Sequence, residues 1–294
     1  MSFVAQVAID AVSLGSLYAL VALGIAIIFG IMTLINFAHG ELIMVGAYTI
    51  FLLQNQPAIV LVLAPVLVVM LSALAMERIA FRPVRNATPT TLLVTSFALS
   101  YFLQNAARMI MGSLPKSVGV FPGLSEAFEV GGLRIPKIDV ATLFVTAVLL
   151  IGLTLLLTRT RIGIQMRASA EDFRMARLLG VRANTVIAFA FAISGMLAGA
   201  VSILYVSQTG VVGPTMGVAP VLVGFVGTVI GGMNRLTTAA LGGFFFGCMV
   251  VVLQAELPLE LRTFRDAFAF TIVIAILLVR PQGLFGGRLA VARV

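Results

Sequence analysis

Near its beginning the chain reads Val4-Ala-Gln-Val-Ala-Ile-Asp-Ala-Val-Ser-Leu-Gly-Ser-Leu-Tyr-Ala-Leu-Val-Ala-Leu-Gly-Ile-Ala-Ile-Ile-Phe29, and this stretch decides the fold class. A membrane-spanning helix needs about 20 predominantly apolar residues, and the stretch exceeds that length. Residues 1–9 lack the basic segment of a signal peptide, and no evident cleavage site follows the apolar run. We therefore predict a retained first transmembrane helix.

Similar apolar runs recur along the whole chain. Hydrophobic residues make up 61% of the 294 residues, charged residues only 10%, and the mean hydropathy is +1.14. A soluble domain of this size cannot hide so much apolar surface. We predict an all-α, polytopic membrane protein that forms one domain over residues 1–294, with about eight or nine transmembrane helices. The predicted spans are 4–29, 40–53, 58–79, 91–111, 140–157, 185–206, 218–230, 236–253 and 264–279.

Two of these spans, 40–53 and 218–230, are short and interrupted by glycine. Broken segments are tolerated at membrane depth where protein or a water-filled cavity surrounds them, so both are candidates to line a transport path. The alternative is a misassigned hairpin. Because each half of the chain has a short glycine-rich segment followed by a longer apolar one, an internal pseudo-repeat is a further hypothesis.

Glycine spacing predicts close helix packing. Three pairs lie four residues apart: Gly195 and Gly199, Gly227 and Gly231, and Gly243 and Gly247. Such spacing lets helix backbones approach each other, which matters in lipid because no hydrophobic force drives helices together there. We favour this packing role over a role in lining a path.

The net charge of +8 reflects membrane topology and not a nucleic-acid partner, because the arginines gather in loops beside the spans. Loop 78–85 and segment 159–182 are predicted to be cytoplasmic, and 112–138, with a hairpin around Gly131-Gly132, external. Arg280 places the C-terminus in the cytoplasm. The N-terminus is external with nine spans and internal with eight. A single cysteine, Cys248, excludes an intrachain disulfide.

The sequence offers no catalytic machinery. A phosphate-binding loop needs a lysine after glycine, but the only lysines, Lys116 and Lys137, each follow proline. We found no metal-ligand spacing, no pairing of a nucleophile with a base and no dinucleotide fingerprint. We therefore expect no cofactor, no metal and no enzymatic activity, and in particular no ATP hydrolysis by this chain.

A polar cluster joins Asn36, His39, Gly40 and Glu41 between two apolar runs. The favoured interpretation is structural: Asn36 caps a helix, and Glu41 in its first turn meets the positive end of the helix dipole. The alternatives are that the cluster lines a translocation path, or that it couples transport to protons.

The longest polar interruption is Arg159-Thr-Arg-Ile-Gly-Ile-Gln-Met-Arg-Ala-Ser-Ala-Glu-Asp-Phe-Arg-Met-Ala-Arg-Leu-Leu-Gly-Val181. Its basic residues alternate with apolar contact positions, a pattern typical of a short surface helix that meets another protein.

Four blocks of sequence resemble the branched-chain amino-acid permease family of ABC importers, in its shorter, LivH-type subunit. The blocks are 35–48, 78–86, 167–181 and 280–286, in family order over nearly the whole chain. The resemblance implies that 159–184 is a cytoplasmic coupling loop whose short helix seats on an ATPase subunit. It assigns this coupling to Arg167, Glu171, Asp172, Phe173, Ala176, Leu179 and Gly180. The chain departs from the general importer pattern by reading Ala-Glu-Asp at 170–172 where Glu-Ala-Ala would stand.

The resemblance further implies a complex in the inner (plasma) membrane, surrounded by lipid. It would contain a second, longer LivM-like permease subunit, two ABC ATPase subunits and an external solute-binding protein. Leucine, isoleucine and valine are the leading substrates; relatives that carry urea, amides or other amino acids are the alternative. A secondary carrier or channel that uses His39 and Glu41 is the competing class, and an intramembrane enzyme is a distant third.

Overall fold

A computed structural model describes residues 2–121, 123, 126–130, 133–232 and 236–285. The described chain is almost entirely helical, which confirms the predicted all-α membrane fold. Its α-helices are α1 (Ser2–Met32), α2 (His39–Leu53), α3 (Ala58–Met76), α4 (Arg82–Val84), α5 (Pro89–Met111), α6 (Lys137–Arg159), α7 (Arg161–Glu171), α8 (Phe173–Leu178), α9 (Ala183–Thr209), α10 (Val218–Gly231), α11 (Leu236–Glu256) and α12 (Arg265–Val279). A π-helix, η1 (Glu77–Phe81), joins α3 to α4, and a 3-10 turn, η3 (Arg262–Phe264), precedes α12.

Each predicted span corresponds to one helix. Five stretches are long and apolar enough to cross a membrane: Phe3–Met32, Ala58–Val84, Lys137–Arg159, Ala183–Thr209 and Leu236–Glu256. The helices α2 and α10 are the short apolar ones, as the sequence predicts for 40–53 and 218–230. The chain is thus a multi-pass membrane protein in which long spans surround two short helices.

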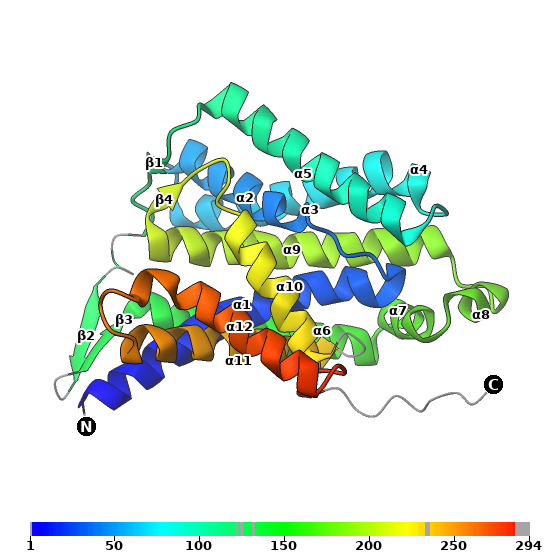
Figure 1. Cartoon of the computed structure of the whole chain (residues 1–294). Helices are drawn as coiled ribbons and strands as arrows, with labels where there is room; N and C mark the ends of the chain where they lie inside the picture. Colours follow the sequence, from blue (N-terminus) through cyan, green and yellow to red (C-terminus); the bar gives the residue numbers. More distant parts are fainter. Residues whose placement is uncertain (1, 122, 124–125, 131–132, 233–235, 286–294) are drawn as a thin grey trace.

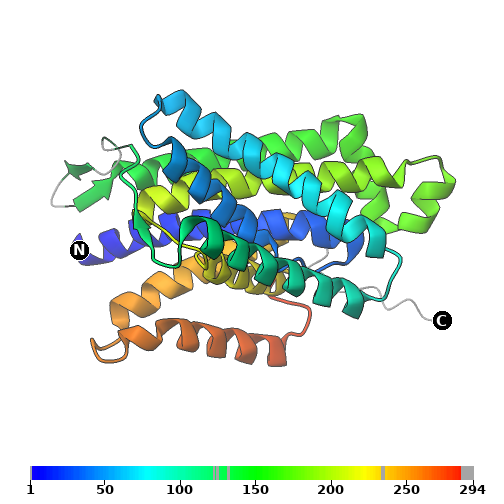
Figure 2. The ribbon, with the colours of Figure 1, turned by 90° about the horizontal axis from the view of Figure 1, so that it is seen from above.

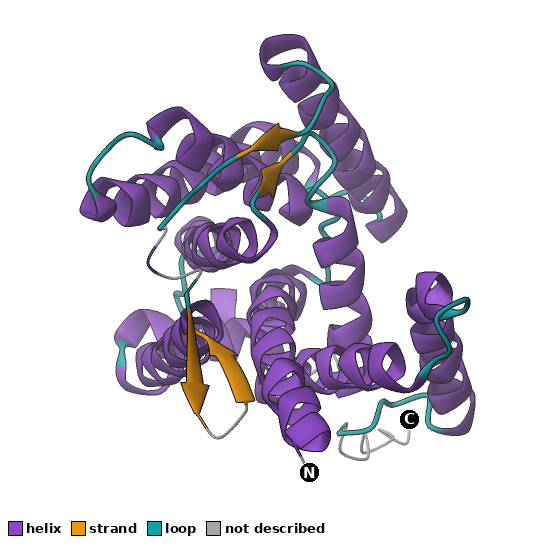
Figure 3. Ribbon diagram, turned by 90° about the vertical axis from the view of Figure 1, so that its left-hand side faces the viewer, coloured by secondary structure: helices purple, strands orange, loops and turns teal. Residues whose placement is uncertain are grey.

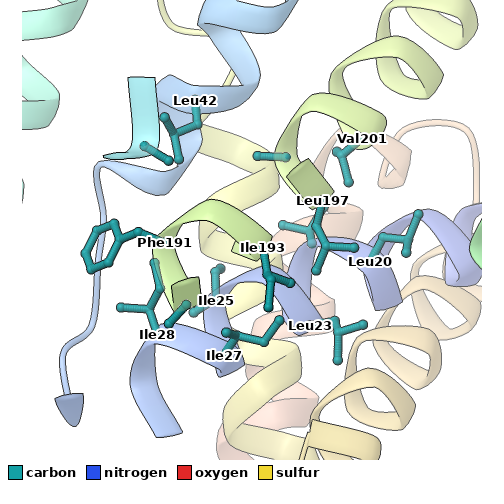
Figure 4. Packing of buried hydrophobic residues seen from close by; sticks show 14 of the residues in the cluster. Leu20, Leu23, Ile25, Ile27, Ile28, Leu42, Phe191, Ile193, Leu197 and Val201 are labelled. Carbon is teal, nitrogen blue, oxygen red and sulfur yellow. The ribbon is translucent and has the colours of Figure 1, made fainter. Parts of the chain in front are cut away.

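Helix α1 lies at the centre of the bundle. It packs against α6, α9, α10 and α11, while α3 covers the other side of α9. Figures 1 and 2 show α1 and α9 running side by side through the middle of the molecule. Their facing side chains form the main apolar core, and Figure 4 shows Leu20 and Ile27 of α1 beside Ile193 and Leu197 of α9. In the described chain α1 is the long span most deeply buried by protein.

Glycines allow these helices to approach to backbone contact, which confirms the predicted packing role of the three glycine pairs. A Cβ atom added to Gly199 would lie 2.7 Å from Val66 Cα of α3, and one added to Gly227 would lie 2.6 Å from Gly243 Cα of α11. A Cβ at Gly247 would lie 2.5 Å from Gly15 Cα of α1. Close approach of this kind supplies van der Waals contact between helices in lipid.

The bundle has two distinct ends. At one end the N-terminus meets a β-hairpin of β2 (Ala127–Val130) and β3 (Leu133–Pro136), where the Gln6 side chain donates to Arg134 O and accepts from Arg134 N. Figure 3 shows the hairpin beside the start of α1. At the other end lie α7, α8 and the end of α12 (Figure 1), and Arg85 donates to Asn184 there. The two arginine-rich loops therefore share one end, and the N-terminus lies at the opposite one.

The predicted hairpin is confirmed, with Phe128 opposite Ile135 in an antiparallel register; its central glycines at 131–132 lie outside the described residues. Lys137 donates to Glu126 beside it and holds the pKa of that carboxyl below its usual range. A second small sheet pairs β1 (Lys116–Ser117) with β4 (Val211–Val212), which ties the loop after α5 to the loop after α9.

The glycine contacts predict opposite effects for two alanine substitutions. We expect Gly247→Ala to destabilise the protein by about 1–3 kcal/mol, because its Cβ would collide with the α1 backbone. Gly152→Ala on α6 meets nothing within 4 Å, so there we expect neutrality or a gain of about 0.5–1 kcal/mol. Thermal unfolding in detergent measures the stability of both variants. Equal unfolding midpoints for Gly247→Ala and Gly152→Ala would contradict the packing assignment.

Candidate functional site

The two short helices begin at one point inside the bundle. A Cβ atom added to Gly40, in the first turn of α2, would lie 2.3 Å from Gly217 O, and one added to Gly217, directly before α10, would lie 1.9 Å from Gly40 O. The two backbones are therefore in direct contact, and only glycine fits at either position. Discontinuous helices that meet inside a membrane protein are a recurring way to build a transport site.

His39, the first residue of α2, joins three helices. It has no exposed surface. Ser194 Oγ of α9 donates to Gly24 O of α1 at 2.8 Å and lies 3.2 Å from His39 Nδ1, so it accepts from Nδ1–H. The other ring nitrogen, Nε2, has no hydrogen-bond partner and packs where Gly24 lacks a side chain; a Cβ there would lie 2.9 Å away. This geometry supports the structural interpretation of His39.

Asn36 does not cap α2 as predicted. The N-cap residue is Ala38, and no side chain bonds to the helix from that position. Instead, Asn36 Oδ1 accepts from Ala38 N at 3.1 Å and closes a turn within the linker 33–38. The prediction was wrong because the linker continues two residues beyond Asn36 before the helix begins. Glu41 does lie in the first turn of α2, as expected.

Glu41 links α2 to α5. Its side chain is buried, and Oε1 accepts from Ser100 Oγ and Gln104 Nε2, both at 2.8 Å. Ser96, one turn before Ser100, donates to Leu93 O of its own helix at 2.7 Å, and its Oγ also lies 3.3 Å from Ile35 O of the linker. Serine, serine and glutamine at four-residue spacing thus give α5 a polar stripe that faces the start of α2. Neither Ser96 nor Ser100 was predicted as a site residue, although their four-residue spacing with Gln104 is a signal in the sequence.

An aromatic group borders the cluster. Phe37, in the linker before α2, stacks on Phe97 of α5 with ring centroids 4.3 Å apart and contacts Phe225 of α10 at 5.7 Å. Phe97 is half exposed. The start of α2 is therefore polar on the side of Ser100 and aromatic on the side of Phe97. Among the described residues no group of histidine, cysteine, aspartate or glutamate side chains is arranged to hold a metal ion.

The arginine-rich segment forms two helices where the sequence predicts one. Thr160 caps α7, and Asp172 ends α7 and caps α8 by accepting from Met175 N at 2.8 Å. Asp172 therefore breaks the segment, because its side chain bonds better as a cap than within a helix. Gly180 follows α8 with φ +89°, a left-handed backbone conformation that glycine favours and that ends the helix.

The tip of this segment is apolar and exposed. Met175, Leu178 and Leu179 are 53%, 75% and 80% exposed, whereas Ala176 packs inward. Glu171 is exposed, and so is Arg167 on α7; Phe173 is partly covered by the core. Helix α7 contacts α1, α6 and α9. The sequence-predicted residues therefore form two separate groups. One lies at the start of α2 inside the bundle, and the other lies in α7 and α8 at one end of the bundle.

The family of the chain follows from comparison. A family model described as "Branched-chain amino acid transport system / permease component" matches residues 7–279. The chain belongs to this permease family. The permease is 32% identical over 295 residues to the protein named high-affinity branched-chain amino acid transport system permease protein BraD of Pseudomonas aeruginosa, covering 96% of this chain and 95% of the relative.

Other relatives carry similar names. The permease is 33% identical over 294 residues to the high-affinity branched-chain amino acid transport system permease protein LivH of Escherichia coli, covering 94% of each chain. It is 29% identical over 290 residues to a probable branched-chain amino acid transport permease protein LivH of Methanocaldococcus jannaschii, covering 94% of this chain and 90% of that one. No solved structure matches the permease. Its relatives are named as transport permease proteins and not as enzymes.

Substitutions of His39 separate a structural role from a chemical one. We expect His39→Gln to keep the protein within about 1 kcal/mol of the wild type, because an amide can still bond to Ser194. We expect His39→Ala to cost about 2 kcal/mol or more, because it leaves a cavity between α1 and α9. Thermal unfolding measures stability, and substrate uptake by the glutamine variant should persist. Normal assembly of that variant with complete loss of uptake would show that the imidazole acts in transport.

Proposed function

We propose that the protein is the membrane-spanning subunit of a binding-protein-dependent ABC importer that carries leucine, isoleucine and valine. The family match over residues 7–279 supports this function most strongly, because the relatives that share nearly the whole chain are named for branched-chain amino acid transport. Substrate crosses the inner membrane, and ATP hydrolysis in partner subunits drives the movement.

The coupling surface in this proposal is the segment 159–184, and its tip is the exposed apolar side of α8. An apolar tip ringed by arginines suits a groove on an ATPase subunit, because the apolar side chains supply contact area and the charges orient the encounter. Arg167, Glu171 and Asp172 lie along the approach to the tip, Phe173 and Ala176 anchor α8 to the bundle, and Leu179 and Gly180 end it.

Movement of this surface reaches the transport site through α7. Because α7 contacts α1 and α9, a displacement of α8 is passed to the two helices that hold His39 between them. Packed helices shift as rigid bodies between discrete arrangements. Closure of the ATPase subunits would thus move the start of α2, with Asn36, Gly40 and Glu41, and alternate the access to a path between this chain and a LivM-like second permease subunit.

The decisive experiment measures leucine uptake in proteoliposomes that contain the full complex and an external binding protein. We expect uptake that requires ATP and the binding protein, with no ion gradient imposed. Uptake that needs an ion gradient and no ATP would instead indicate a secondary carrier. ATP-dependent uptake of another solute, such as urea, with none of leucine would keep the importer and change its substrate.

A matched pair of leucine variants tests the coupling surface. Leu179 and Leu259 are 80% and 78% exposed, but Leu259 lies in the loop between α11 and α12, at the end that carries the hairpin. We expect Leu179→Asp to weaken co-purification of the ATPase subunits at least tenfold, since it places a charge at the apolar contact, and Leu259→Asp to leave it unchanged. Equal retention of ATPase subunits by both variants would remove α8 from the interface.

The proposed orientation places the hairpin outside and α8 with the C-terminus in the cytoplasm. In a Cys248→Ala background, we expect Glu126→Cys to react with a membrane-impermeant maleimide in intact cells, because Glu126 is exposed. We expect Leu178→Cys, which is also exposed, to react only after the membrane is opened. The reverse pattern of labelling would invert the topology.

A further inference from the structure

Only one carboxylate oxygen of Glu41 has hydrogen-bond partners. Oε1 accepts two hydrogen bonds from α5, whereas Oε2 has no partner, and the residue is 1% exposed. No basic side chain of the described chain lies within ion-pair distance of it. Arg108, one turn beyond Gln104, donates to Asn105 instead. The result is a buried carboxylate with one oriented oxygen and one vacant one.

A buried carboxylate oxygen without a hydrogen-bond partner is stabilised when it gains a hydrogen-bond donor. Leaving a buried polar group unpaired costs about 1–3 kcal/mol, and more when the group is charged. Charge-assisted hydrogen bonds are the strongest compensation, and a primary ammonium group offers three donors on a compact cation. The chain itself supplies no such group at Oε2, so a ligand that carries one would relieve the cost.

We propose that Glu41 Oε2 receives the α-ammonium group of the amino acid during translocation, while Ser100 and Gln104 hold the carboxylate in place through Oε1. This inference rests on the proposed function, because it takes an amino acid as the cargo. It distinguishes Glu41 from its neighbours: His39 is held between α1 and α9, and Asn36 bonds within its own linker.

The surroundings of Glu41 have a polar side and an aromatic side, which match the charged end and the apolar side chain of an aliphatic amino acid. Phe97 precedes Ser100 by three residues on α5, which is about one helical turn, and Phe37 of the linker stacks on Phe97. The aromatic pair therefore lies about one turn from Ser100, which donates to the Glu41 carboxylate. Phe225 of α10 completes the aromatic group. Such a border gives an apolar surface to a branched side chain, while the polar stripe of α5 orients the ammonium end.

Helix α5 is the element that would expose the site. Its main contacts are with α2 and η1, and the polar stripe supplies the hydrogen bonds between α5 and the start of α2. A tilt of α5 that keeps the bonds at Oε1 would uncover Oε2 and open Glu41 to the path. The conformation described here is then an occluded one, with Glu41 covered.

The first test compares Glu41→Gln with the wild type in the complete complex. The glutamine carbonyl still accepts from Ser100 and Gln104, so a purely structural link between α2 and α5 would survive. We expect leucine uptake to fall at least tenfold, with assembly and binding-protein-stimulated ATP hydrolysis within twofold of the wild type. Glu41→Asp, which keeps the charge, should fall between the two. Uptake by Glu41→Gln within twofold of the wild type would overturn the proposal.

A second pair of variants keeps the test decisive if Glu41→Gln fails to assemble. Gln104→Lys places a tethered ammonium beside Glu41 and should occupy the site from within, lowering uptake at least tenfold. Gln104→Met has similar length and no charge; it removes one hydrogen bond to Oε1 and should lower uptake much less than Gln104→Lys does. Equal uptake by the two variants would contradict ammonium recognition.

Leucine uptake by the wild-type complex in the same preparation shows whether the assignment of Glu41 fails or the proposed function fails. If the wild type takes up leucine with ATP and the variants do not differ from it, only the assignment of Glu41 fails. If the wild type takes up no leucine under any condition, the proposed function fails instead. Wild-type uptake that ends when a proton gradient is collapsed, with ATP still present, would likewise contradict the proposed ATP-driven function.

Discussion

The backbone contact between Gly40 and Gly217 is the constraint on which the proposed transport site depends. Two helices can begin at one point inside the bundle only if neither carries a side chain there. That contact places the first turn of α2 under α5 and against α1 and α9, so that Glu41 meets Ser100 and His39 meets Ser194. The polar groups are thereby gathered in protein surroundings, where broken helices are tolerated within a membrane.

Glycines, which lack a side chain, also allow close backbone contacts in the rest of the bundle. Backbone contacts at Gly199, Gly227 and Gly247 join α3 to α9, α10 to α11, and α11 to α1. Helix α5 differs because it is attached to α2 by hydrogen bonds from serine and glutamine. Leucine side chains of α5 also pack against the apolar core. The molecule therefore combines a centre held by glycine contacts with one helix that adds hydrogen bonds to its apolar packing.

The sequence predicted the class of fold, the position of each apolar helix, the glycine packing and the hairpin, because apolar run length and residue spacing are local properties. It failed at the boundaries of helices and at polar contacts between segments far apart in the sequence. The turn at Asn36 depends on where α2 can begin against Gly217, and Asp172 divides the surface segment because a cap competes with helix continuation. Ser100 and Ser194 are ordinary residues in sequence, and only their partners across the bundle single them out.

The central place of α1 has a consequence for biogenesis. Helix α1 packs against α11, which follows it by more than 200 residues and is therefore synthesised later. Until residue 256 has entered the membrane, the face of α1 that carries Gly15 lacks the helix that covers it in the finished bundle. Incomplete chains would thus display a glycine-lined surface of α1 that only the later synthesis of α11 removes from lipid.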